Sequence, residues 1–442
     1  MLRSSILAGL AGMLLLSGCS FNVGSSLGMG SVDRLSQVVG DEPYAVKTGA
    51  EVLAQGGNAV DAAAAMYFTL SVTYPAAAGL GGGGICIVRD PAKEVSEEFA
   101  FLPANAASSG YAVPGAAVAI AAMQAEYGAL PWQKVVSPGE SYARTGFPMT
   151  KALAARLDAV GKDKLSPEQA AEFYDASGKL KSIGSTLTNP ALAETLAALR
   201  TGGPQALLRG KIADAVLATL KAQGVSVTPE ELASYKVVRG TPRVSEVGGN
   251  YVYLPASGKM AGSYAGALVD AVARAKKLDR AALAAAVQQT LTKAGLSAGS
   301  DIGATSFAVT DAKGRAVSCA VTLNAPFGAG RTVPGTGIVL AAATGPNAAF
   351  LAPVIVSESS DGPAVMAGAG AGGPNGAAVL AAALVNLGRD EPPAKRSDLV
   401  TLQDSPYDAG NLIVCNSDVC TALPDPAGSG FGVTVPLPDV KK

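Results

Sequence analysis

Side chains that could act as nucleophiles are concentrated in residues 303–324, where threonines and serines alternate with small apolar residues. A threonine or serine hydroxyl becomes nucleophilic when a base removes its proton, and a free N-terminal amino group can be that base. The chain contains no histidine, which excludes Ser-His-Asp and Cys-His catalysis and removes the commonest metal ligand. Any hydroxyl nucleophile here therefore needs a base other than histidine.

The hydroxyl-rich stretch has the pattern of a β-hairpin. Two runs rich in β-branched residues, 304–310 and 316–324, are separated by Asp311-Ala-Lys-Gly-Arg315. A three-residue loop with glycine in its last position suits a type I turn closed by a left-handed residue, here Gly314. The spacing therefore predicts two paired antiparallel strands.

The pairing across this loop predicts which side chains share a face. If Asp311 faces Arg315, residue 304 lies directly opposite Thr322, and side chains alternate between faces along each strand. One face is then apolar core and includes Thr305. The other face is small and polar, and carries Ala304, Ser306, Ala308, Thr310, Ala316, Ser318, Ala320, Thr322 and Asn324.

This hairpin resembles the start of the small subunit of γ-glutamyltranspeptidases, which are N-terminal nucleophile hydrolases. Members of that family cut themselves before a Thr-Thr-His-aromatic-Ser-Val-Val-Asp run, and the freed first threonine is the nucleophile. Here the run reads Ala304-Thr305-Ser306-Phe307-Ala308-Val309-Thr310-Asp311. The resemblance therefore places an alanine, whose methyl group cannot attack, at the nucleophile position.

Other segments resemble the family's large subunit. They include the glycine-rich stretch 49–84 and the segments 127–147 and 228–235. The resemblance covers most of residues 41–387 and implies an α+β fold, the four-layer αββα sandwich of N-terminal nucleophile hydrolases. Periodicity alone would give only α/β or α+β. We expect residues 41–303 to form a large-subunit-like part and 304–442 a small-subunit-like part of one domain.

The resemblance also assigns supporting site residues. Thr322 matches the threonine that supports the nucleophile, and Asn324 matches a substrate-contact residue. Gly372 and Gly373, in the run Gly370-Ala-Gly-Gly373, match the oxyanion-hole glycines with a small offset. The alternatives are an ordinary polar pair on a half-buried strand, and glycines that allow close packing before a helix.

Substrate-anchoring residues of the family have no counterpart. The run 99–103 lacks the arginine that holds the substrate carboxylate, and 340–346 lacks the acid that holds the amino group. The paired serines are absent from 349–353. Because an amino-acid head group needs an opposite charge at each end, we expect the former cleft to be apolar and uncharged.

Thr305 is the first alternative nucleophile, since cleavage before it would also free an N-terminal threonine. Strand alternation argues against it, because residue 305 points away from the face of Thr322 and Asn324. Ser306 shares the correct face but lies one pair further along the strand.

The first residues have the features of an export signal. Arg3 precedes the apolar run 6–16, which is too short to span a bilayer. Leu16-Ser-Gly-Cys19 resembles a bacterial lipobox, so residues 1–18 are predicted to be a lipoprotein signal peptide and Cys19 the lipid-modified residue. An ordinary secretory signal is the alternative.

The expected location follows from this signal. Ser20 after the cysteine resembles lipoproteins sent to the outer membrane, so we expect a periplasmic protein held at the membrane by the lipid on Cys19. Residues 19–40 are predicted to be a flexible tether, with folded structure beginning near Tyr44.

The remaining cysteines fit an exported protein. Cys415 and Cys420 flank a four-residue turn between apolar runs, which favours a disulfide across a hairpin. Cys86 and Cys319 lie in apolar runs and are expected to be buried small hydrophobic residues.

The amino-acid composition argues against several classes of binding partner. The charges balance at 34 basic against 35 acidic residues, without a basic cluster for phosphates, so nucleic acid is not expected. No cysteine or histidine spacing indicates a metal, and no cofactor is expected.

Three functions stay open: a binding or scaffold protein that has lost catalysis and holds a small molecule or peptide in the old cleft, an active γ-glutamyl hydrolase or transferase with an atypical site, and a purely structural envelope lipoprotein.

Overall fold

The computed structural model describes residues 34–102, 104–105, 112–113, 115–256, 262–273, 275, 278–298, 301–402, 407–416 and 419–436. These described residues form one compact unit. No helix among these described residues is long and apolar enough to cross a membrane.

Two antiparallel sheets form the centre of this unit. The seven-stranded sheet has the order β17 (Phe431–Val435), β1 (Ser36–Gly40), β11 (Ala304–Thr310), β12 (Ala316–Thr322), β2 (Gly83–Asp90), β3 (Val95–Ala100) and β8 (Val238–Gly240). The six-stranded sheet has the order β16 (Val419–Leu423), β15 (Ala409–Asn416), β14 (Ala364–Ala371), β13 (Ala352–Ser357), β10 (Asn250–Leu254) and β9 (Arg243–Val247). Two further pairs are β4 (Ala104–Asn105) with β5 (Ala112–Val113), and β6 (Phe147–Pro148) with β7 (Thr186–Leu187).

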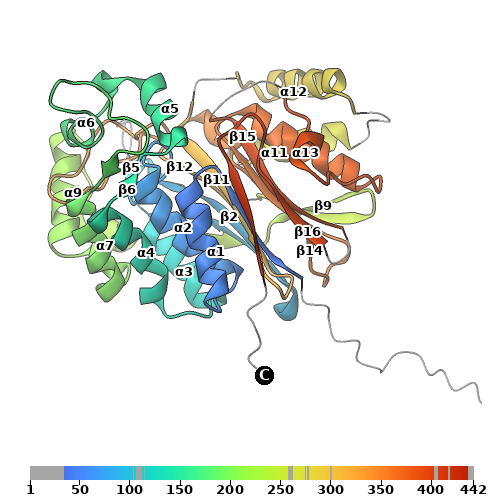
Figure 1. Ribbon diagram of the computed structural model, residues 1–442, viewed down its shortest axis with the longest axis horizontal. Helices are drawn as coiled ribbons and strands as arrows, with labels where there is room; N and C mark the ends of the chain where they lie inside the picture. Colours follow the sequence, from blue (N-terminus) through green and yellow to red (C-terminus); the bar gives the residue numbers. More distant parts are fainter. Residues whose placement is uncertain are drawn as a thin grey trace, which may run out of the picture. The chain divides into compact units, whose positions relative to one another are not determined.

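Helices cover the outer face of each sheet, as Figure 1 shows. Those on the side of the seven-stranded sheet are α1 (Pro43–Ala54), α2 (Ala59–Thr73), α3 (Ala116–Tyr127), α4 (Trp132–Thr145), α5 (Lys151–Val160), α6 (Pro167–Phe173), α7 (Pro190–Gly202), α8 (Gln205–Leu208), α9 (Lys211–Ala222) and α10 (Pro229–Ala233). Those on the side of the six-stranded sheet are α11 (Ser263–Val272), α12 (Arg280–Ala294) and α13 (Pro374–Leu387). The predicted αββα sandwich of the α+β class is confirmed.

The inner faces of the two sheets pack against each other, with β11 and β12 lying over β14. Side chains such as Val39, Ile87, Ala308, Ile355 and Ile413 fill the space between the sheets. The opposite face of β11 and β12 packs against α2. Both faces of the hairpin are therefore buried, and small residues on the inner face let the sheets approach.

The hairpin has the predicted register. Ala304 lies opposite Thr322, and Thr310 lies opposite Ala316. Gly314 has φ +76°, and the Asp311 carboxylate accepts the backbone N–H groups of Lys313 and Arg315 at 3.0 and 3.1 Å. Turn chemistry thus determines which residue faces which at the far end of the strands.

The start of α2 also follows a local rule. Asn58 accepts the N–H groups of Val60 and Asp61, and Asp61 in turn accepts the Asn58 N–H. This reciprocal capping box satisfies donors that have no partner within the helix. Asn58 is therefore the N-cap of α2.

The predicted tether is wrong at its C-terminal end. Residues 36–40, expected to be flexible, form the buried strand β1 between β11 and β17. Folded structure therefore begins before Tyr44. The strand escaped prediction because it is short and pairs only with segments hundreds of residues away.

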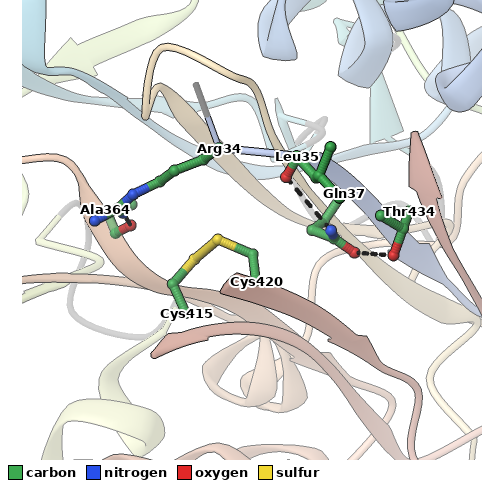
Figure 2. Close-up of a disulfide and its surroundings, with 7 residues drawn as sticks. All are labelled: Arg34, Leu35, Gln37, Ala364, Cys415, Cys420 and Thr434. Atoms are coloured by element: carbon green, nitrogen blue, oxygen red, sulfur yellow. Dashed lines mark hydrogen bonds between the residues drawn. A yellow bond between two sulfur atoms is a disulfide. The ribbon is translucent and has the colours of Figure 1, made fainter. Parts of the chain in front are cut away.

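Four cysteines form two disulfides. Cys415 and Cys420 are joined across the β15–β16 hairpin (Figure 2). Cys86 and Cys319 are buried, as expected, and the sequence left open whether they pair. They lie directly opposite each other on β2 and β12 and are also joined. Their sequence separation of 233 gave no pairing signal.

Candidate functional site

Thr322 holds the backbone that precedes residue 304. Its hydroxyl oxygen lies 3.0 Å from the carbonyl oxygens of both Ile302 and Gly303, and it accepts the Asn324 N–H at 2.8 Å. The Gly303 carbonyl also accepts the Leu323 N–H at 2.8 Å. The carbonyl on the N-terminal side of Ala304 thus accepts one backbone N–H and shares the single Thr322 hydroxyl proton with the Ile302 carbonyl, an arrangement that polarises it.

Glycine is required at position 303. Its φ is +60°, in the left-handed region, and a Cβ there would lie 2.0 Å from the Ala325 carbonyl oxygen. The following residue, Ala304, is 1% exposed. The apolar side chains that cluster with it come from both sheets and the preceding linker: Ile85, Ile302, Ala320, Leu351, Ala369 and Ala371.

An arginine that the sequence interpretation missed lies beside position 304. Arg156, on α5, is 1% exposed and pairs with Asp301 at 2.7 Å. Its Nη1 donates to the Tyr74 hydroxyl at 3.3 Å and reaches the Ala304 carbonyl oxygen at 3.5 Å. The guanidinium also lies over the rings of Tyr74 and Tyr407.

This ion pair corrects the expectation of an apolar, uncharged cleft. The sequence contained one signal for it. Ala152, Leu153, Arg156 and Leu157 form the buried stripe of α5, so the arginine occupies a position with apolar spacing. A charged residue in such a stripe usually has a buried partner.

Replacing Arg156 with methionine is expected to lower the free energy of unfolding by about 3 kcal/mol, because Asp301 would keep a largely buried charge without its partner. Chemical denaturation measures the loss. The double variant Arg156→Met/Asp301→Asn should recover part of the stability. An unchanged denaturation midpoint in the single variant would contradict a structural role for the pair.

Thr305 and Ser306 contact a different acid. The Thr305 hydroxyl donates to Asp41 Oδ2 at 2.7 Å, and the Ser306 N–H reaches the same oxygen at 3.2 Å. Asn411, on β15, donates to Asp41 Oδ1 at 2.7 Å and to Ser306 Oγ at 3.0 Å. Desolvation raises the pKa of Asp41 above its ordinary value, against these hydrogen bonds. A hydroxyl beside such a carboxyl could lose its proton to it.

The glycines predicted as an oxyanion site form the turn between β14 and α13. Gly372 has φ +94°, and a Cβ there would lie 1.6 Å from the Tyr407 carbonyl oxygen. A Cβ on Gly373 would meet the Asp408 carboxylate. That carboxylate accepts the N–H groups of Asn375 and Gly376 at 3.1 and 2.8 Å. Close packing explains why both positions are glycine. The N–H groups of Asn375 and Gly376 already donate to the Asp408 carboxylate.

The titration of Asp408 should be visible in stability. Burial raises its pKa from 3.8 to about 6. Because the folded state binds this proton more tightly than the unfolded state, its contribution to stability is largest below about pH 4 and falls as the pH rises to about 6. Between pH 4 and pH 7, the free energy of unfolding of the Asp408→Asn variant should change by about 2 kcal/mol less than that of the wild type. Parallel denaturation curves at pH 4 and pH 7 for both proteins test this, and an identical pH dependence would refute it.

Asn324 adopts a left-handed backbone conformation with φ +62°. Its Nδ2 donates to the Ala342 carbonyl at 2.8 Å and to the Thr344 hydroxyl at 3.1 Å. The side chain therefore holds the segment after residue 340 next to the end of β12. The structure brings Ala304, Thr322 and Asn324 together, and Arg156 links them to the Tyr407 region beside Gly372. Cys19 lies outside the described residues.

Comparisons with known proteins agree with this fold. The sequence profile of the family described as gamma-glutamyltranspeptidase matches residues 45–272 and 264–345. The glutathione hydrolase proenzyme of Escherichia coli (strain K12) is 31% identical over 242 residues, covering 50% of this chain and 42% of that protein. The proenzyme of the same name from Pseudomonas aeruginosa is 32% identical over 256 residues, covering 51% and 44%. This chain thus spans less than half the length of these relatives.

Solved structures support the fold. Cephalosporin acylase from Bacillus halodurans superposes with a TM-score of 0.71 at 18% identity, covering 95% of this chain and 99% of that one. The gamma-glutamyltranspeptidase of Helicobacter pylori gives 0.51 at 23% identity, covering 57% and 80%. The profile match extends over most of the folded unit, and the chain therefore belongs to the gamma-glutamyltranspeptidase family.

Proposed function

We propose that this family member does not cut itself before residue 304 and acts as a lipid-anchored binding or scaffold protein of the bacterial periplasm. The observation that carries the proposal is the methyl group of Ala304 opposite Thr322, where the family's nucleophile would stand. The lipid anchor rests on the signal-like residues 1–18 and Cys19, and Ser20 favours the outer membrane.

The contacts of the neighbouring hydroxyls are consistent with this proposal. Thr305 is 1% exposed and its hydroxyl is bound to Asp41, while Ser306 is 1% exposed and contacts Asn411. Neither hydroxyl lies where Thr322 could support it against the Gly303 carbonyl, because Thr322 pairs with residue 304. A substitute nucleophile would require a shift of the strand.

Intact mass and denaturing gel analysis of the purified mature protein tests the proposal. A single chain is expected. Two fragments, with a new N-terminus at residue 304, 305 or 306, would refute it. Mass analysis of the same sample also shows whether Cys19 carries a lipid.

The second candidate is an active γ-glutamyl hydrolase or transferase acting on glutathione or γ-glutamyl peptides. It is favoured by the 2.7 Å hydrogen bond from Thr305 to Asp41, which pairs a hydroxyl with a carboxyl that could accept its proton. Incubation with glutathione, with glutamate release as the readout, decides between the two. Activity that is lost in Thr305→Val and retained in Ser306→Ala would establish this candidate.

The binding proposal has its own test. A thermal-shift series with γ-glutamyl peptides and small apolar metabolites should raise the melting temperature for at least one compound class. No shift across the series, with an intact chain, would leave the purely structural envelope lipoprotein as the better description.

A further inference from the structure

The outermost strand of the seven-stranded sheet, β17, has an edge that no strand of the described residues covers. It pairs with β1 on one side and ends the sheet on the other. In an antiparallel pair, alternate residues direct their backbone N–H and C=O groups away from the neighbouring strand, so β17 presents such groups at its free edge. Outer strands usually carry charged side chains, a proline or a bulge that prevents further pairing. The five residues of β17 are Phe-Gly-Val-Thr-Val, with an unbroken register to β1, and include none of these features.

An apolar groove of about 530 Å³ runs along this edge. One wall is the face of α1 that carries Tyr44, Ala50 and Ala54, and the other is the outer face of β17. Phe431 in this wall is 46% exposed, and Val433 is only partly buried. The groove therefore suits a partner that offers both a strand edge and an apolar face.

A second copy of β17 fits this edge. A two-fold axis perpendicular to the sheet would pair the two strands antiparallel, and residues directly opposite each other would then point to the same face. An axis at Val433 places Val433 opposite Val433 of the second copy, and Phe431 opposite Val435 of the second copy. All three side chains line the groove on the outer face. Thr434, on the inner face, donates to Gln37 of β1 at 2.9 Å and leaves this apolar strip unbroken (Figure 2).

The charged side chains of α1 fit the same axis. Residue 49 lies over the centre of the strand, because a Cβ on Gly49 would be 2.9 Å from Cγ1 of Val38, and Val38 lies directly opposite Val433. Lys47 and Glu51 stand two residues before and two residues after Gly49, and both line the groove. The axis reverses the second helix, so Lys47 of each copy faces Glu51 of the other. Within one copy the two side chains are 61% and 53% exposed, so both can contact a second copy.

We propose that the mature protein forms a symmetric dimer in which two β17 edges join the seven-stranded sheets into one continuous sheet. The two α1 helices lie side by side across the join, with their Lys47 and Glu51 side chains paired between copies. A second copy is favoured over an unrelated extended peptide because the apolar pattern of β17 and the charges of α1 are self-complementary about one axis. The inference is independent of self-cleavage at residue 304 and of the lipid anchor.

Sedimentation equilibrium tests the dimer. The chain used begins at Ser20, so that no lipid can be attached and drive association. A reversible monomer–dimer equilibrium is expected. A monomer at every concentration would overturn the proposal. A monomer that dimerises only after residues 437–442 are removed would also overturn it, because the chain's own C-terminal segment would then be the occupant of the edge.

Charge variants on α1 locate the interface. Lys47→Glu and Glu51→Lys each place like charges opposite each other across the axis, and each should weaken the dimer about tenfold. The exchange Lys47→Glu/Glu51→Lys restores opposite charges and should return the affinity to within about threefold of the wild type. Lys293→Glu, on α12 in the other helical layer, is the matched control and should leave the affinity unchanged. Equal affinities in all four variants would overturn the assignment of this surface.

Phe431→Lys tests the strand edge itself. A charge at this half-exposed position would lie in the apolar strip of the dimer, so the variant should be monomeric at concentrations where the wild type is dimeric. Circular dichroism of the same sample checks that it is folded. A folded Phe431→Lys variant that still dimerises with wild-type affinity would contradict pairing through β17. If this variant does not fold, the charge-exchange series on α1 still decides the proposal.

Discussion

Ala304→Thr is expected to make the chain cut itself between residues 303 and 304, yielding fragments 1–303 and 304–442, less any signal peptide removed. The Gly303 carbonyl already accepts the Leu323 N–H at 2.8 Å and lies 3.0 Å from the Thr322 hydroxyl. A hydroxyl on residue 304 would stand beside a polarised carbonyl carbon. The missing hydroxyl would then be what keeps the chain intact.

The chemical step balances without a further reactant except water. The introduced oxygen attacks the Gly303 carbonyl carbon, and its proton passes to the residue 304 nitrogen as the peptide C–N bond breaks. Water then hydrolyses the ester, which leaves a carboxylate on Gly303 and a free amino group on residue 304. Denaturing gels and N-terminal sequencing over hours to days follow the product.

Two controls isolate the hydroxyl. Ala304→Val has nearly the same shape as the threonine variant and carries the same overpacking cost of about 1–3 kcal/mol in this closed environment. It should stay intact, and so should Ala304→Thr combined with Thr322→Val. If Ala304→Thr folds and stays uncut, a hydroxyl on residue 304 is not sufficient for self-cleavage in this chain.

Removal of the Cys86–Cys319 disulfide is expected to cost about 5 kcal/mol of stability, against about 2 kcal/mol for Cys415–Cys420. The first bridge spans 233 residues of sequence and the second spans 5, so the first restricts the unfolded chain far more. Cys86→Ala/Cys319→Ala and Cys415→Ala/Cys420→Ala therefore form a matched pair of variants. Guanidinium denaturation under non-reducing conditions measures both.

Equal losses of stability in the two double variants would show that restriction of the unfolded chain is not the main source of the stabilisation by these disulfides. Both pairs lie on adjacent antiparallel strands, and all four cysteines are less than 10% exposed. The variants therefore remove similar sulfur atoms from similar environments. The difference between them reports mainly on loop length.

Sequence-based prediction succeeded where structure follows from neighbouring residues. The loop from Asp311 to Arg315 determined the pairing of Ala304 with Thr322, because turn geometry and strand alternation are both local. The family resemblance supplied the sandwich, which periodicity alone could not.

Prediction failed where partners lie far apart in the sequence. β1 pairs with β11 and β17, and its five residues carry no strong strand pattern of their own. Asp41 meets Thr305 across 264 residues and Asn411 across 370. No local pattern reports such contacts, and the charged surroundings of position 304 were missed for this reason.

The sequence by itself determined the hairpin and its register, because both depend on residues within one turn and one strand pair. Only the tertiary structure decided that Arg156 and Asp301 form a buried pair beside Ala304 and that Cys86 joins Cys319. Burial and long-range pairing set the energy of these groups, and both exist only once the sheets and helices have packed.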